Sequence, residues 1–119
     1  MMNTRKTGAV YETLAAEYLK KQGYWILAQN FRTPFGEIDI IAQKDGTLVY
    51  VEVKYRKADS CGNPLEAVDK RKQRQISRVA NYHYASYAAG REIACRFDVI
   101  GISGTGELNH IENAFYFQG

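Results

Sequence analysis

Hydrophobic residues recur along this chain with two periods, about 3.6 positions in some segments and about two in others. The longer period predicts two helices. The first runs from about Gly8 to Gln22, and the second from about Pro64 to Tyr87, with Asn63 as its N-cap. Strand-like segments lie at residues 24–30, 37–44, 47–55 and 96–102, with residues 108–112 as an optional last strand. The order α-β-β-β-α-β predicts an α/β fold in which helices flank a mixed sheet.

The dipeptide Asp45-Gly46 predicts a two-residue hairpin loop that pairs Lys44 with Thr47 and thereby sets the register of the two strands. One face of the hairpin would be apolar, with the pairs Ile38–Val53, Ile40–Val51 and Ala42–Val49. The other face would place Asp39 directly opposite Glu52, and Glu37 opposite Lys54. The register therefore predicts two carboxylates in close proximity.

Directly opposed carboxylates repel by on the order of 1 kcal/mol in water, and by more near a low-dielectric surface. A Mg²⁺ ion between Asp39 and Glu52 would remove that repulsion, because Mg²⁺ takes one or two carboxylates and keeps water and phosphate as its other ligands. Lys54 and Arg56 project on the same face and could orient a water or stabilise charge on a phosphate. A solvated ion-pair ladder is the alternative, although a ladder would avoid opposed like charges.

Each predicted helix carries charged residues in unusual places. The first has an apolar arc formed by Val10, Tyr11, Leu14, Ala15, Tyr18 and Leu19, and Glu12 lies at its edge. The second has a basic stripe suited to phosphates, or equally to solvent, formed by Lys70, Arg71, Arg74 and Arg78. Lys72 falls among apolar positions of that helix, where it either extends to solvent along its stem or points into a site.

Composition adds few constraints. The chain has 119 residues, 45% of them hydrophobic, and a net charge of +3, which fits one domain over residues 1–119 and permits a polyanionic partner. Its two cysteines, Cys61 and Cys95, form neither a disulfide framework nor a zinc motif. No segment is long enough to cross a membrane. We therefore expect a cytoplasmic protein without a membrane partner.

Asp39 followed by Glu52-Val53-Lys54 on the next strand resembles the PD-(D/E)xK signature of the restriction-endonuclease-like nucleases, with Ile38 in place of the proline. The chain is most similar to the YraN family of small bacterial proteins within that superfamily. The motifs that carry this resemblance are Gly8 and Glu12, Asn30 and Arg32, GEID at 36–39, VEVKYR at 51–56, Gly62 and Pro64, Lys72, RFDV at 96–99 and HIENAF at 110–115.

The resemblance implies that Asp39 and Glu52 hold Mg²⁺ or Mn²⁺, that Glu12 assists the metal site, and that Lys54 acts at the attacking water. Candidate nucleic-acid-binding residues are Arg32, Arg56, Lys70, Arg71, Lys72, Arg74 and Arg78. The predicted function is a metal-dependent endonuclease on DNA, which is favoured over RNA, with branched or processed structures as one substrate class. A homodimer would suit such two-fold substrates. The alternatives are a non-catalytic nucleic-acid-binding module with the same fold, and an interaction domain with a structural ion-pair face.

Overall fold

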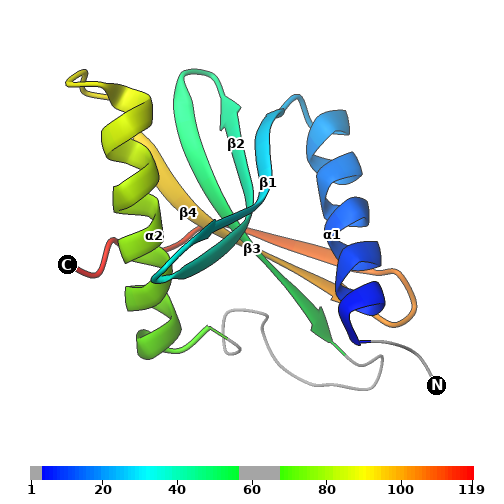
Figure 1. The fold of residues 1–119 in the computed structure, drawn as a ribbon. Helices are drawn as coiled ribbons and strands as arrows, with labels where there is room; N and C mark the ends of the chain where they lie inside the picture. The colour runs from blue at the N-terminus through cyan, green and yellow to red at the C-terminus, as the bar shows by residue number, and fades with distance from the viewer. Residues whose placement is uncertain (1–3, 57–67) are drawn as a thin grey trace.

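A five-stranded mixed sheet lies between two helices, with one helix packed on each face (Figure 1). The structure is a computed structural model that describes residues 4–56 and 68–119. Its elements are α1 (Thr4–Lys21), β1 (Trp25–Thr33), β2 (Gly36–Lys44), β3 (Thr47–Arg56), α2 (Lys70–Ala88), β4 (Cys95–Ser103) and β5 (Leu108–Phe115). This order confirms the expected arrangement, including the optional last strand, and is consistent with a restriction-endonuclease-like core.

Strands that are neighbours in the sequence are also neighbours in the sheet, which has the order β1-β2-β3-β4-β5. All pairs are antiparallel except β3 and β4, which run parallel. Parallel neighbours need a crossover connection, and α2 lies between these two strands in the chain. Within the described residues, neither helix is long and apolar enough to span a membrane.

The buried stripe of α1 differs from the one that its hydrophobic pattern indicates. Ala15, Ala16 and Leu19 are buried against the sheet, whereas Val10 is 56% and Leu14 45% exposed. The two alanines allow the helix backbone to approach the strands closely, and this rotates the larger residues outward. The rotation also turns Glu12, one helical turn before Ala16, toward the sheet.

The β2–β3 hairpin follows the predicted register over its first five pairs, from Lys44↔Thr47 to Ile40↔Val51. Asp45 and Gly46 both have positive φ, at 52° and 78°, as a tight two-residue hairpin turn requires. The central part of the sheet is therefore set by a local turn signal.

Beyond Ile40 the predicted register is wrong, because the two strands separate. β2 continues along β1 as far as Gly36, and β3 continues along β4 as far as Arg56. The expected pairs Ile38–Val53, Asp39–Glu52 and Glu37–Lys54 are absent from the described ladder. Ile38 packs with the core under α2, whereas Ile40 packs under α1, so the two do not share a face.

α2 begins later than the sequence predicts. Val68 and Asp69 are not helical, so a continuous helix from Pro64 is excluded, while Asn63 and Pro64 themselves lie outside the described residues. Asp69 is the N-cap, and its side chain accepts a hydrogen bond from the Lys72 backbone N–H at 2.8 Å. A capping carboxylate at this position satisfies a free N–H of the first turn, which explains why the helix starts here.

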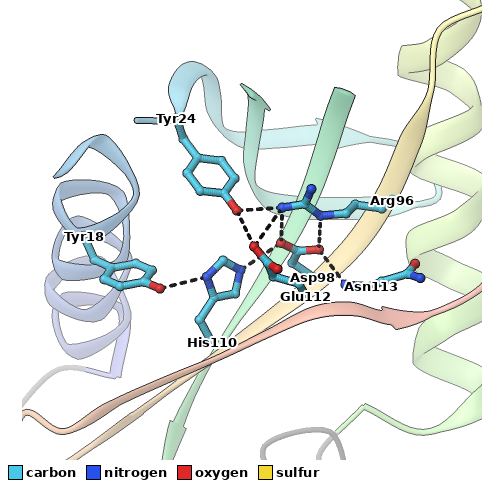
Figure 2. A network of polar contacts seen from close by, with 7 residues as sticks. All are labelled: Tyr18, Tyr24, Arg96, Asp98, His110, Glu112 and Asn113. Carbon is cyan, nitrogen blue, oxygen red and sulfur yellow. Dashed lines mark hydrogen bonds and ion pairs between the residues drawn. The ribbon is translucent and has the colours of Figure 1, made fainter. Parts of the chain in front are cut away.

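A buried carboxylate on β4 organises the edge of the sheet (Figure 2). The Asp98 side chain is inaccessible to solvent and accepts hydrogen bonds from Arg96 Nε at 3.0 Å and from the Asn113 backbone N–H at 3.0 Å. His110 Nε2 lies 2.8 Å from its other oxygen. The register of β5 shifts opposite Asp98, and Asn113 there has a φ of 52°. This irregularity aims the Asn113 N–H at the carboxylate.

The same network reaches α1 and the start of β1. The Tyr18 hydroxyl of α1 lies 3.0 Å from His110 Nδ1, and Arg96 Nη2 donates to the Tyr24 hydroxyl at 2.6 Å (Figure 2). Tyr24 in turn donates to Glu112 at 3.1 Å. A chain of polar contacts therefore connects β4 and β5 to α1 across the sheet edge.

Burial alone would raise the pKa of Asp98, but the hydrogen bonds from His110, Arg96 and Asn113 outweigh it and lower that pKa. We expect Asp98→Asn to destabilise the protein by about 3 kcal/mol at pH 7, because it removes the buried ionic partner of Arg96, which retains the exposed Glu112 at 3.4 Å. Urea unfolding would measure this loss. Asp45→Asn removes the same charge from an exposed turn and is expected to change stability by less than about 0.5 kcal/mol.

The loss of stability in Asp98→Asn should become smaller as the pH falls. A lowered folded-state pKa gives a contribution that is complete above the unfolded pKa, about 3.9, and that disappears as the pH falls through the folded value. The stability difference between the wild type and Asp98→Asn should therefore narrow below about pH 4. A difference that stays constant down to pH 3 would contradict the assignment of an ionised, hydrogen-bonded Asp98.

Candidate functional site

Asp39 lies at the point where β2 separates from β3. Its Oδ2 accepts a hydrogen bond from the Val53 backbone N–H at 2.8 Å, which takes the place of a ladder hydrogen bond. Asn30, in β1 between the residues paired with Ile40 and Ile38, has a φ of 53°. Asparagine tolerates this left-handed conformation better than most residues. β1 and β2 are thus distorted at the point where β3 departs.

Glu52 and Lys54 come from β3, on the same face as Tyr50, which packs under α2. Glu52 is only 5% exposed. Lys72 Nζ of α2 lies 3.4 Å from its Oε2 and Lys54 Nζ lies 3.8 Å away, yet this oxygen has no hydrogen-bond partner among the described residues. Of the two interpretations of Lys72, the structure therefore selects the one in which it points into the site.

The pKa of Glu52 is raised to about 9, chiefly by burial and then by hydrogen bonding and charge from Asp39. Lys72 and Lys54 act in the opposite direction but do not compensate these two effects. Asp39 and Glu52 are therefore close enough to share a proton or a cation, although they are not a ladder pair. The predicted proximity of Asp39 and Glu52 is confirmed, but the predicted ladder pairing between them is wrong.

Glu12 approaches Asp39 from α1. Burial raises its pKa to about 7, and hydrogen bonding and charge from Asp39 add to that increase. With its amide nitrogen oriented toward α1, Asn30 donates to the two Glu12 oxygens at 2.8 and 3.1 Å. The sequence analysis names Asn30 only as part of a family motif and assigns it no role. The signal that could identify it is the presence of asparagine, a residue depleted in strands, within a predicted strand.

These three carboxylates do not form a complete metal cage. Among the described residues, no group of three histidine, cysteine, aspartate or glutamate side chains converges as metal ligands would. Asp39 contacts Glu52 on one side and Glu12 on the other. Mg²⁺ needs only one or two protein carboxylates, and Glu52 offers a buried oxygen without a hydrogen bond. The residues present therefore fit a Mg²⁺ or Mn²⁺ ion at Asp39 and Glu52, with Glu12 adjacent.

Two cavities flank the carboxylates. One, of about 500 Å³, lies toward α1 and is lined by Gly8, Ala9, Tyr11, Glu12, Asn30, Arg32, Glu37, Asp39, Val53 and Tyr55. The other, of about 360 Å³, lies toward α2 and is lined by Lys54, Asp69, Arg71, Lys72 and Gln75. The first contains three carboxylates, and the second contains three of the predicted basic residues. Acidic residues are therefore in excess on the α1 side of the site, and basic residues are in excess on the α2 side.

The remaining predicted basic residues differ in their availability. Lys70 and Arg74 are exposed on α2, on the surface that carries Arg71. Arg78 stacks over the Phe35 ring at 4.1 Å. Arg32 pairs with Glu37 at 3.1 Å. Arg56 ends β3 and is half-buried. The predicted basic stripe is thus present as an exposed surface, and Arg32 and Arg78 already have partners within the chain.

Comparisons with known proteins support one family. The sequence pattern of the family described as "Uncharacterised protein family UPF0102" matches residues 11–102. A UPF0102 protein of Vibrio parahaemolyticus is 44% identical over 115 residues, which cover 96% of this chain and 95% of that protein. One from Lachnoclostridium phytofermentans is 46% identical over 114 residues, which cover 96% of each chain.

Among solved structures, SfsA of Pyrococcus furiosus in complex with Ca²⁺ is 15% identical, with a TM-score of 0.37, over 94% of this chain and 64% of that one. A likeness of this size carries no weight for fold or function. The matches at the level of sequence confirm the resemblance to the YraN family. The chain therefore belongs to the uncharacterised protein family UPF0102.

Proposed function

We propose that the protein is an endonuclease that uses Mg²⁺ or Mn²⁺ to hydrolyse phosphodiester bonds in DNA. The observation that carries the proposal is the environment of Glu52, a buried carboxylate beside Asp39 with one oxygen that lacks a hydrogen bond. Burying such a group is unfavourable unless a partner compensates it. A divalent cation held by Asp39 and Glu52 would supply that compensation.

When bound, the cation would activate a water molecule and neutralise charge on the attacked phosphate. For this role, the hydrogen bond from the Val53 N–H would hold Asp39 in place, and burial would restrict the Glu52 side chain. Lys54 Nζ, at 3.8 Å from Glu52, can orient the attacking water or donate to a phosphate oxygen. Lys72 brings a second ammonium group from α2, and together the two lysines favour an anion on this side of the carboxylates.

A non-catalytic nucleic-acid-binding module is the second candidate. It is favoured by the exposed basic residues of α2, Lys70, Arg71 and Arg74, and by the lack of a three-carboxylate cage among the described residues. Such a module would bind nucleic acid through phosphates, with an affinity that falls as salt rises. It would not need Asp39 or Glu52.

Strand cleavage separates these functions. In Mn²⁺, we expect the wild type to cut at least one member of a labelled panel of duplex, flap, four-way-junction and single-stranded DNA. Asp39→Asn should reduce the rate by at least about a hundredfold, because it removes a ligand charge. This variant retains an oxygen acceptor for the Val53 N–H, whereas Asp39→Ala would leave that group unpaired.

Asp45→Asn, with the same charge change on an exposed turn, is the matched control and should cleave like the wild type. Equal cleavage by the wild type and Asp39→Asn would identify a contaminating nuclease. Binding without cleavage by any form would support the binding module instead.

Metal binding can be measured independently of cleavage. Mn²⁺ at a hundred times its Kd should stabilise the wild type by about 2.7 kcal/mol, because the folded state alone presents Asp39 and Glu52 together. Thermal unfolding would show this as a rise in Tm that EDTA reverses. Asp39→Asn should lose most of the rise and Asp45→Asn should keep it. An equal rise in both variants would place the bound ion elsewhere.

A further inference from the structure

Two stacked tyrosines line the cavity on the α1 side of the carboxylates. The rings of Tyr11 in α1 and Tyr55 in β3 lie 4.6 Å apart between centroids, with an angle of 26° between their planes. Tyr55 is 47% exposed. Glu12 and Asp39 line the same cavity of about 500 Å³, a volume within the range of small-molecule sites. Aromatic surface is thus accessible directly beside the proposed reaction centre.

The charges around this cavity indicate which part of a nucleotide it would accept. Glu12, Glu37 and Asp39 line it together with one cation, Arg32, which pairs with Glu37, so acidic groups are in excess and a phosphate would be repelled there. Lys54, Arg71 and Lys72 line the cavity on the α2 side together with one acid, the N-cap Asp69, so basic groups are in excess and a phosphate would be attracted there. A nucleotide that spans the carboxylates would therefore place its phosphate toward the lysines. Its uncharged, planar base would lie toward the tyrosines.

The polar groups of this cavity are poorly placed for reading a particular base. With its amide nitrogen oriented toward α1, Asn30 donates to both oxygens of Glu12. Arg32 Nε pairs with Glu37, although a guanidinium has further N–H donors. Stacking on an aromatic ring, by contrast, tolerates any base, because every base has a π-face. The site would select an exposed base over a buried one and would discriminate weakly among sequences.

We infer that the Tyr11–Tyr55 pair is a stacking site for an unpaired nucleobase of the substrate strand. The substrate class is then DNA with an unpaired nucleotide beside the cut phosphate, as at a single-stranded end, a flap or a bulge. In a continuous duplex, neighbouring base pairs cover both faces of each base, so a base must leave the stack to reach Tyr55. This inference rests on the proposed function for the position of the phosphate.

Binding of labelled DNA tests the inference directly. Fluorescence anisotropy would compare a 12-nucleotide thymidine oligomer, the same oligomer with abasic sites, and a 12-base-pair duplex, in EDTA and again in Ca²⁺. We expect Tyr55→Ala to weaken binding of the thymidine oligomer by about five- to a hundredfold, the effect of losing one stacked base. Binding of the abasic oligomer and the duplex should change less than about twofold.

Three further variants exclude other causes. Tyr55→Phe keeps the ring and should bind like the wild type. Tyr55→Val keeps a residue that suits strands and should reproduce the defect of Tyr55→Ala, so a folding failure of the alanine variant would not explain the loss. Tyr82→Ala removes an exposed tyrosine of α2, 58% accessible, that does not line the cavity, and it should have no effect.

Equal losses on single-stranded, abasic and duplex DNA, or no loss on any of them, would overturn the stacking site. The cleavage assay keeps this outcome distinct from failure of the proposed function. Metal-dependent cleavage that is unaffected by Tyr55→Ala would retain the nuclease and reject the stacking site. Base-dependent binding through Tyr55, with no cleavage of any substrate, would retain the stacking site and reject catalysis.

Discussion

The separation of β2 from β3 after Ile40 is the constraint on which the rest of the site depends. If the hairpin continued in register, Asp39 and Glu52 would be ladder partners on one surface, and each could be solvated. Instead, Asp39 bonds the Val53 N–H and contacts Glu12 from α1, while Glu52 is buried beside Lys72 from α2. The opening between the strands lets carboxylates from two sides of the sheet meet, and it makes both helices part of one site.

Two buried carboxylates on the neighbouring strands β3 and β4 differ in their hydrogen bonding and in the direction of their pKa shifts. Asp98 on β4 has four polar contacts from Arg96, His110 and Asn113, and its pKa is lowered. Glu52 on β3 has two lysines at ion-pair distance, an oxygen without a hydrogen bond, and a raised pKa. A satisfied buried acid stabilises a fold, whereas an unsatisfied one is typical of functional sites. The Asp98 network also holds Tyr18 of α1, the helix that presents Glu12.

The sequence predicted the features that depend on local signals. The Asp45-Gly46 turn predicts five ladder pairs correctly. Asp39 and Glu52 are also close together as predicted, although they are not a ladder pair. The separation of the strands could not be predicted in the same way, because beyond Ile40 β2 follows β1 and β3 follows β4, and no local turn signal specifies that divergence. The rotation of α1, which exposes Val10, likewise depends on how closely Ala15 and Ala16 approach the sheet.

The position of Lys72 illustrates the same limit for a single residue. Periodicity left Lys72 with two interpretations, since a lysine stem covers apolar surface equally well whether its ammonium reaches solvent or a buried acid. Only the start of α2 at Lys70, capped by Asp69, places Lys72 in the first turn, level with Glu52.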